Sequence, residues 1–218
     1  FRRQMHRGAE IGCDGERTFT TYLGAAVHLS PEDLSPALFS GARIVHIEGY
    51  LVQNHALLRR AVLLARESGA QVSLDLASHN VVRDNLLFLR EIVSSGRIDI
   101  LFANEEEATA FTGRGEPERA LDDIARWCAV TVVKLGKRGS TACRGDERVT
   151  VPARPVPCRD TTGAGDLYAA GFLYGLLQDL PLRRCAEIGT VLASRVICRI
   201  GAKLAPEDWE AVRAEVLS

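Results

Sequence analysis

The sequence lacks a surplus of charge of either sign. Its 27 Lys and Arg residues face 28 Asp and Glu residues, so the formal net charge is −1 at pH 7. Proteins that bind nucleic acid or an anionic membrane need a clustered basic surplus, because phosphate backbones and acidic lipids are the charges they neutralise. The balance therefore argues against nucleic acid and the membrane surface as main partners.

Long apolar runs are also missing. The longest, residues 169–177, has nine residues, and a membrane-spanning helix needs about 20. The basic stretch at residues 1–7 has no apolar core behind it and does not resemble a signal peptide. We therefore expect a cytoplasmic protein.

Metal-binding spacings are absent as well. The six cysteines include no Cys-x-x-Cys pair, and the five histidines include no His-x-x-x-His pair. This excludes zinc-ribbon and thioredoxin-like motifs and a dedicated transition-metal site. Several cysteines lie in apolar surroundings, so we expect free thiols in a reducing compartment. The cysteines are Cys13, Cys128, Cys143, Cys158, Cys185 and Cys198.

What the chain does have is a globular composition and a regular alternation of elements. Its 218 residues are 46% hydrophobic, enough for one domain with a small appendage. Short apolar runs predict strands, and apolar stripes at helical spacing predict helices between them. Strands alternating with helices indicate a parallel sheet with helices on both faces. The predicted strands are 44–47, 72–76, 98–102 and 130–133, and the predicted helices are 54–67, 81–93, 105–111 and 121–128.

The pattern changes after residue 133. Residues 140–143 and 148–151 flank a polar turn and predict an antiparallel hairpin. Residues 17–22 predict a strand with one polar face, outside the alternating series. Helices are predicted over 164–177, 182–197 and 206–217.

The most informative stretch reads DTTGAGDLYAAGFLYG, residues 160–175. Gly163, Ala164 and Gly165 come directly before a strong helix, with Asp166 in its first turn. Unpaired amides at a helix start, together with the helix dipole, can hold an anion. Asp166 beside such a hole fits a base that takes a proton from an attacking hydroxyl. The alternative is a tight turn with Asp166 favoured by the dipole.

Two other phosphate-binding motifs are excluded. A dinucleotide fingerprint requires a third glycine where Tyr168 stands. A P-loop requires Gly-Lys-Ser/Thr, but Gly136 and Lys137 are followed by Arg138. A nicotinamide-dependent oxidoreductase would suit the α/β pattern but lacks its glycine motif.

The stretch from Asp160 to Asp166, followed by an Ala/Gly-rich helix, resembles the C-terminal signature of the PfkB (ribokinase-like) carbohydrate and nucleoside kinases. Three further elements match in the same order: 104–107 (NEEE), 134–139 (KLGKRG) and 199–202 (RIGA). The resemblance covers nearly the whole chain. It implies a three-layer α/β/α fold with a central, mostly parallel sheet, a C-terminal hairpin and a partial β lid.

The resemblance also implies a reaction. In that family ATP gives its γ-phosphoryl group to a hydroxyl, usually a hydroxymethyl, of a sugar or nucleoside. Carried over, Asp166 is the general base, and the amides of Gly163, Ala164 and Gly165 stabilise the developing negative charge. The cofactors are ATP and Mg²⁺, with K⁺ as a further candidate. A catalytically inactive nucleotide-binding relative is the alternative, although the retained Asp166 argues against it.

Family positions also assign the cofactor-binding residues. Asn104 and Glu107 correspond to residues that act through Mg²⁺ and its waters, although the pair alone is a helix-capping box. Asp160 and Thr162 match positions that bind a monovalent cation. The remaining nucleotide-binding candidates, each of which is otherwise a turn or helix residue, are Lys134, Gly136, Lys137, Gly139, Thr190, Gly201 and Ala202.

The substrate side is less complete. Residues 14–25 resemble the lid strand of sugar and nucleoside kinases, with a mild preference for adenosine-kinase-like members. Arg17 is a candidate for contact with substrate or phosphates, or else a solvated arginine. Asp75, at a strand end, is a candidate for positioning the acceptor. Lid strands of this family often pair between subunits, which suggests a homodimer.

The departures from the family pattern lie at the beginning of the chain. No Gly-Gly pair is present, and no apolar strand is evident just before Asp14. We therefore expect the N-terminal part of the family domain to be absent from this sequence; the alternative is a degenerate relative of the family. Residues 1–30 are interpreted as a remnant of the substrate-side segment with the lid strand, and residues 31–218 as the nucleotide-binding α/β kinase domain.

Overall fold

The computed structural model describes residues 6–11, 17–22 and 28–217, with side chains from His28 onward. Its centre is a six-stranded sheet in which the strands follow one another in chain order. The first four strands pair in parallel, and the last two add antiparallel, as the predicted hairpin requires. The strands are β3 (Ile44–Glu48), β4 (Gln71–Asp75), β5 (Ile100–Asn104), β6 (Val130–Lys134), β7 (Ser140–Arg144) and β8 (Glu147–Val151).

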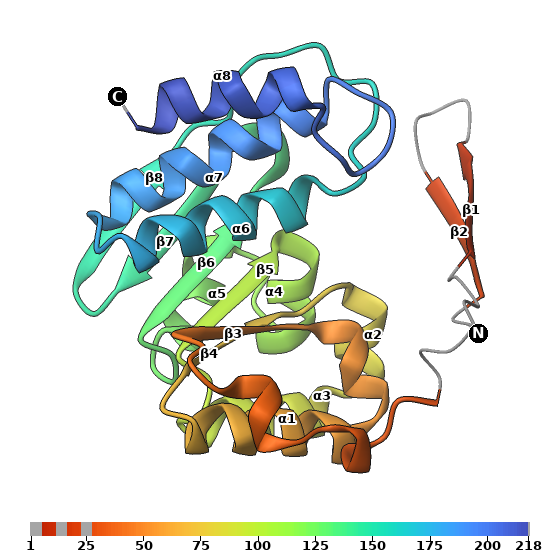
Figure 1. Ribbon diagram of the computed structural model, residues 1–218. Coiled ribbons are helices and arrows are strands. Elements are labelled where there is room, and N and C mark those ends of the chain that lie inside the picture. The colour runs from red at the N-terminus through yellow and green to blue at the C-terminus, as the bar shows by residue number, and fades with distance from the viewer. Residues whose placement is uncertain (1–5, 12–16, 23–27, 218) are drawn as a thin grey trace.

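Helices cover both faces of this sheet, which confirms the predicted three layers (Figure 1). The helices form two groups, and each group packs with its own cluster of buried apolar residues from the sheet. The first group is α1 (His55–Glu67), α2 (His79–Asp84), α3 (Leu86–Ser94), α4 (Glu105–Thr112) and α5 (Pro117–Ile124). The second is α6 (Ala164–Leu177) and α7 (Leu182–Val196), with α8 (Pro206–Val216) packed on α7.

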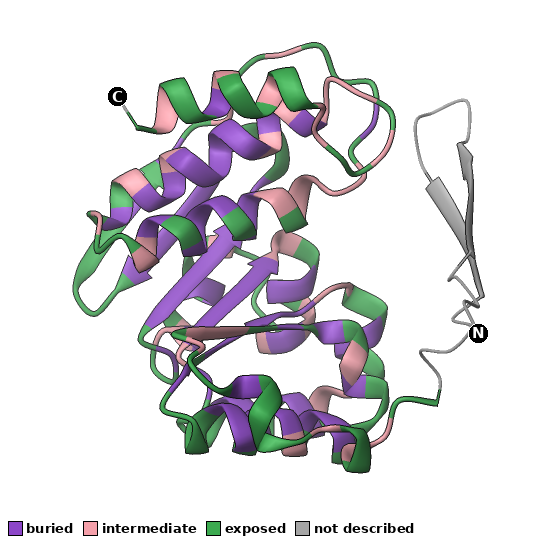
Figure 2. Ribbon diagram, viewed as in Figure 1, coloured by how far each residue is buried: buried purple, intermediate pink, exposed green. Residues whose placement is uncertain are grey.

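The two-residue period of a strand explains why both faces of the parallel strands are mainly apolar. On β5, Leu101 and Ala103 join the cluster of α1 to α5, while Ile100 and Phe102 join the cluster of α6 and α7. Because both faces are covered, both sets of alternate residues are mainly apolar, and the buried exceptions inside the strands, Ser73 on β4 and Thr131 on β6, are small hydroxyl side chains. Figure 2 shows the resulting buried band along the sheet.

The predicted helix over residues 81–93 is wrong as a single element. It is two helices, α2 and α3, separated at Asn85. The side-chain amide of Asn85 donates to the carbonyl of Val81 at 3.0 Å. Its Oδ1 lies 3.0 Å from Nε2 of His55. Asparagine that bonds its own backbone competes with helix continuation, so the break follows from this residue.

The bounds of one helix and one strand also differ clearly from the sequence prediction. Helix α5 begins at Pro117 rather than 121 and ends at Ile124, because proline suits a first helical turn. The strand predicted over 98–102 begins at Ile100 and runs to Asn104. The predicted strand at 17–22 is confirmed as β2 (Arg17–Tyr22), and it pairs antiparallel with β1 (His6–Ile11), a strand that the sequence did not reveal.

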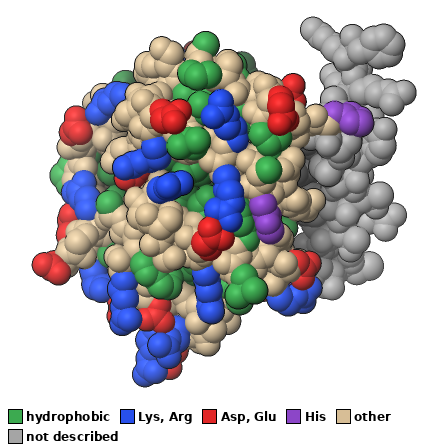
Figure 3. Space-filling model, turned by 90° about the horizontal axis from the view of Figure 1, so that it is seen from below, with side chains coloured by type: hydrophobic (Ala, Val, Ile, Leu, Met, Phe, Trp, Pro, Cys, Tyr) green, Lys and Arg blue, Asp and Glu red, His purple; other side chains and the backbone are tan. Residues whose placement is uncertain are grey.

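Charges on the face over α1 and α3 are of both signs and lie interspersed (Figure 3). Arg59 on α1 pairs with Glu91 on α3 through two contacts of 2.7 Å, and Arg66 pairs with Asp99. These pairs accord with the near-neutral net charge. Within residues 28–217, no helix is long and apolar enough to cross a membrane.

The described cysteines are free thiols. Cys128, Cys143 and Cys185 are buried as expected, and desolvation raises the pKa of the Cys185 thiol to about 11. Cys158 is exposed and Cys198 is half-buried. The expectation of apolar surroundings therefore holds for three of these five thiols.

The edge-to-face contact between Phe102 and Phe172, with ring centroids 5.5 Å apart, joins β5 to α6. Both side chains are fully buried. We predict that Phe172→Ala lowers the free energy of unfolding by about 3–5 kcal/mol, because it leaves a cavity between sheet and helix. Leu87→Ala, at a side chain 85% exposed, should change it by no more than about 0.5 kcal/mol. Urea unfolding measures both, and equal losses would contradict this account of the core.

Candidate functional site

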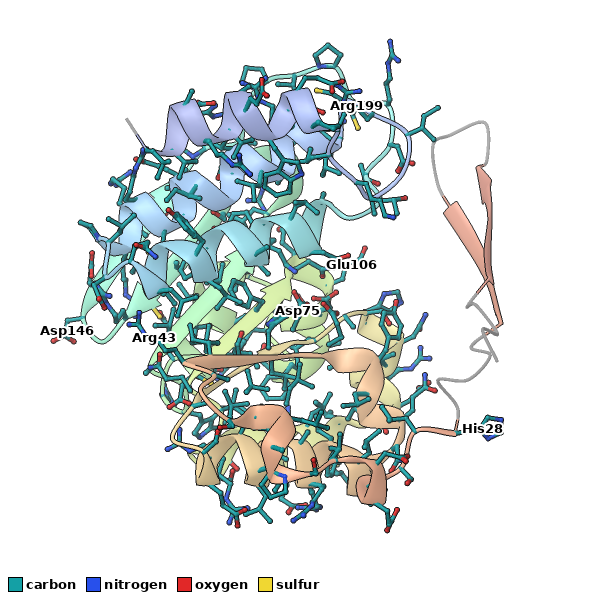
Figure 4. The ribbon with its side chains drawn as sticks, viewed as in Figure 1. His28, Arg43, Asp75, Glu106, Asp146 and Arg199 are labelled. Atoms are coloured by element: carbon teal, nitrogen blue, oxygen red, sulfur yellow. The ribbon has the colours of Figure 1, made fainter. Side chains whose placement is uncertain are left out.

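The parallel strands β4, β5 and β6 each end in a polar residue at the same edge of the sheet. These residues are Asp75, Asn104 and Lys134. In open α/β sheets, ligands bind outside the carboxyl ends of the strands, where the apolar layers stop. Figure 4 shows Asp75 and Glu106 near the start of α6, so this helix begins at the same edge.

The turn before α6 packs directly against the loop that follows α7. Gly163 has φ +79°, and a Cβ at this position would lie 2.7 Å from the Cβ of Ala202. Both the left-handed backbone and this close approach require glycine. Two motifs 38 residues apart in the sequence, at Gly163 and Gly201, are thereby brought side by side.

Asp160 ties the same two segments together. One carboxylate oxygen accepts the amide of Thr162 at 2.6 Å, and the other accepts the amide of Gly201 at 2.9 Å. The side chain is buried. Charge-assisted bonds to backbone amides are stronger than neutral ones, so this carboxylate holds the turn and the loop in register.

Lys134 reaches from β6 to the first turn of α6. Its Nζ lies 2.6 Å from Oδ2 of Asp75, and 3.3 Å from the place where a Cβ on Gly165 would stand. Burial disfavours the ammonium, yet the carboxylates of Asp75 and Glu107 hold the pKa of Lys134 above its usual value. A charged ammonium therefore sits against the helix start that was predicted to bind an anion.

Asn104 and Glu107 form the capping box at the start of α4. The carboxylate of Glu107 accepts the backbone amide of Asn104 at 2.7 Å and its side-chain amide at 2.8 Å. Glu107 is only 2% exposed. Desolvation raises its pKa to about 7, although the charge of Lys134 opposes this rise. The purely structural interpretation of this motif is thus correct as geometry, and the motif also lies at the candidate site.

Two side-chain contacts at this edge of the sheet were not anticipated from the sequence. Arg138, in the short 3₁₀ helix Gly136–Arg138, pairs with Glu105 at the start of α4. His79 on α2 lies 3.2 Å from Glu106. The predicted loop and the NEEE motif are therefore neighbours in space. Only the position of Arg138 inside the KLGKRG motif pointed toward this contact.

The other predicted site residues differ in their surroundings. Asp166 is exposed in the first turn of α6, and Lys137 is exposed in its loop. Thr190 is buried in α7, and its hydroxyl donates to the carbonyl of Ala186 at 2.9 Å. Arg17 begins β2, but its side chain lies outside the described residues.

The groups at this edge include some that can hold an anion. A helix start, the half-buried ammonium of Lys134 and the exposed carboxylate of Asp166 lie together. The described side chains form no group of three or more His, Cys, Asp or Glu suited to a metal ion. Amides and an ammonium can hold phosphate groups, and an exposed Asp166 at their side can accept a proton.

Glu107 predicts a pH dependence of stability. Its folded pKa of about 7 lies above the ordinary value of 4.5, so the folded state binds the proton more tightly than the unfolded state. Stability should therefore fall as pH rises from about 4.5 to about 7, by up to about 3 kcal/mol, and change little from this source above that. Glu107→Gln should lose much of this slope. Urea unfolding at pH 5 and pH 8 tests it, and an unchanged slope in Glu107→Gln would contradict the assignment.

Comparison with known proteins gives consistent results. A model of the pfkB family carbohydrate kinases matches residues 8–209. Cytidine kinase of Thermococcus kodakarensis is 34% identical over 154 residues, which are 67% of this chain and 52% of that protein. The structure of adenosine kinase from Sinorhizobium meliloti superposes with a TM-score of 0.91 at 36% identity, covering 97% of this chain and 66% of that one.

A structure described as a probable sugar kinase from Rhizobium etli gives the same TM-score of 0.91 at 33% identity, covering 98% of this chain and 66% of that one. This chain thus spans from about half to just under two thirds of the length of these relatives. The matched range includes each of the four sequence motifs and the whole six-stranded sheet. The chain belongs to the pfkB family of carbohydrate kinases.

Proposed function

We propose that this chain carries the ATP-handling site of a kinase that transfers the γ-phosphoryl group of ATP to a hydroxyl, typically a hydroxymethyl, of a sugar or nucleoside. The observation that carries the proposal is the start of α6. There Gly163, Ala164 and Gly165 lead into a 14-residue helix, an exposed Asp166 stands in its first turn, and the Lys134 ammonium lies against it. Membership of the family supports the same reaction.

In this proposal Asp166 removes the proton from the acceptor hydroxyl as that oxygen attacks the γ-phosphorus. The amides of Gly163 and Gly165 donate to the oxygens of the transferring group, where negative charge is greatest. The amide of Ala164, which here donates to the carbonyl of Thr161 at 3.2 Å, would exchange that partner for a phosphoryl oxygen. The positive end of the α6 dipole adds to this stabilisation. Phosphoryl transfer depends mainly on positioning and electrostatics, so these groups are sufficient in kind.

Asn104 and Glu107 fit a role toward Mg²⁺ through water. Both offer oxygen atoms, which Mg²⁺ prefers, but these oxygens already take part in the capping box. Direct ligation would break that cap, whereas a hydrated ion held mainly by ATP would leave it intact. When bound, Mg²⁺ neutralises charge on the phosphates, and the chain's part is to orient its water shell.

The nucleotide would lie along the loops around this edge. We assign Lys134, Gly136, Lys137 and Gly139 to its phosphates and ribose, and Gly201 and Ala202 to the opposite side. The Arg138–Glu105 pair supports this assignment, because it joins the loop to the capped start of α4. Thr190 remains a weaker candidate, since its hydroxyl is bonded within α7.

A monovalent cation beside Asp160 and Thr162 is also part of the proposal. Asp160 holds the α6 turn to the loop at Gly201, so a cation there would organise the anion hole without touching substrate. Replacing K⁺ by tetramethylammonium should lower turnover, because a large ion cannot fill such a position. Equal rates in both salts would remove the cation from the mechanism.

The acceptor is proposed to be a nucleoside or a sugar. Two of the relatives described above are named adenosine kinase and cytidine kinase, which favours a nucleoside over a sugar as the acceptor. Arg17 on the β2 strand is the candidate for reaching the acceptor or the phosphates. We also propose that the lid strands pair two subunits into a homodimer, which sedimentation velocity of the complete protein tests.

Asp166→Asn provides the central test of function. We predict that it lowers turnover by roughly a hundred- to ten-thousandfold, because the base is lost. Affinity for Mg-ATP should change by no more than about twofold, because the amides and Lys134 remain. Coupled ADP-release assays with a panel of nucleosides and sugars measure the first, and calorimetry measures the second.

Asp146→Asn is the matched control. Asp146 is exposed at the tip of the β7–β8 hairpin, far from the start of α6 in Figure 4. This variant should retain the wild-type rate. Normal turnover by Asp166→Asn would refute its role as the base. Absence of turnover with any acceptor in the wild-type protein would favour an inactive nucleotide-binding relative.

A further inference from the structure

Both carboxylate oxygens of Asp75 already have partners within the fold. Oδ1 accepts the backbone amide of Ala77 at 3.1 Å, and Oδ2 accepts from Nζ of Lys134 at 2.6 Å. The side chain is only 8% exposed. A carboxylate that binds the hydroxyls of an acceptor needs oxygens directed at that ligand. The geometry of Asp75 instead directs them at the chain itself.

The backbone around Asp75 holds this carboxylate in place. Ala77 has φ +66°, a left-handed conformation that is unusual for a residue with a side chain, and its amide is the one bonded by Asp75. On the other side, a Cβ on Gly49 would lie 2.4 Å from the carbonyl oxygen of Asp75. The end of β4 is therefore closely packed, and the carboxylate cannot move aside without disturbing this turn.

Lys134 needs such a fixed partner. Its ammonium stands against the first turn of α6, near the position of a Cβ on Gly165. That helix end carries partial positive charge, which repels a cation. A lysine ammonium on a flexible four-carbon stem would turn away without a counter-charge. The charge of Glu107 also raises the pKa of Lys134, but both of its carboxylate oxygens accept hydrogen bonds from the amides of Asn104.

We propose that Asp75 is a positioning residue for phosphoryl transfer: it holds the Lys134 ammonium at the first turn of α6, where that charge faces the transferred group. Asp75 therefore acts on the nucleotide side of the reaction and does not bind the acceptor, contrary to its assignment from the sequence. The inference rests on the proposed kinase function.

The test combines Asp75→Asn, Lys134→Met and the double variant in the complete protein. Asp75→Asn should lower kcat about tenfold or more and weaken binding of a non-hydrolysable Mg-ATP analogue, with the acceptor KM changed less than about twofold. Lys134→Met should show the same split. The double variant should be no worse than Lys134→Met, since Asp75 acts through the ammonium.

Asp84→Asn is the matched control, because Asp84 is an exposed aspartate at the end of α2 whose carboxylate pairs with its neighbour Arg83. It should leave all these quantities unchanged. The inference is overturned if Asp75→Asn raises the acceptor KM while analogue binding stays at the wild-type value, or if the losses of the two single variants multiply in the double variant.

Thermal unfolding of each variant separates a loss of activity from a loss of folding. The double variant removes both charges together, so it leaves no unpaired ammonium beside α6. If the wild-type protein transfers no phosphoryl group, the proposed function fails, yet analogue affinity still decides the role of Asp75. Equal weakening in Asp75→Asn and Lys134→Met supports the inference, and unchanged affinity in Asp75→Asn refutes it.

Discussion

Burial of the parallel sheet on both faces is the constraint on which this structure depends. Along β4, β5 and β6 the residues before the last are buried, apart from Gln71 at the start of β4, because helices cover both sides. Charged side chains are therefore displaced to the strand ends, where the apolar layers stop. Asp75, Asn104 and Lys134 occupy those ends, so covering the sheet also gathers the polar groups of the site at one edge.

The gathered charges would be costly if each stood alone. A buried ammonium or carboxylate loses its hydration, and only partners of opposite charge or well-placed donors compensate. Lys134 is compensated by Asp75, while the capping amides of Asn104 engage Glu107. Desolvation still raises the pKa of Glu107 to about 7, so its partners offset the cost of burying its charge only in part. An incoming polyanion would find an ammonium and a helix start already held in place.

Much of the fold was predictable from local patterns. The alternation of strands and helices, the hairpin and the four motifs in order all correspond to observed elements, because each is encoded within a few neighbouring residues. The errors have local causes as well. Asn85 interrupts a helix through its own side chain, and Pro117 begins one earlier than the apolar stripe suggested. The partner strand His6–Ile11 carries no apolar alternation that would reveal it.

The sequence by itself determined the order of the elements, the apolar character of the sheet and the residue types at each turn. These features depend on short-range periodicity and on the backbone preference of each residue. Tertiary structure alone decided which of those turns meet. The contact of Gly163 with Ala202, the pairing of Lys134 with Asp75 across 59 positions, and the bond from Arg138 to Glu105 exist only after both faces of the sheet are packed. Such contacts follow from the summed packing of many elements, and no local pattern encodes that sum.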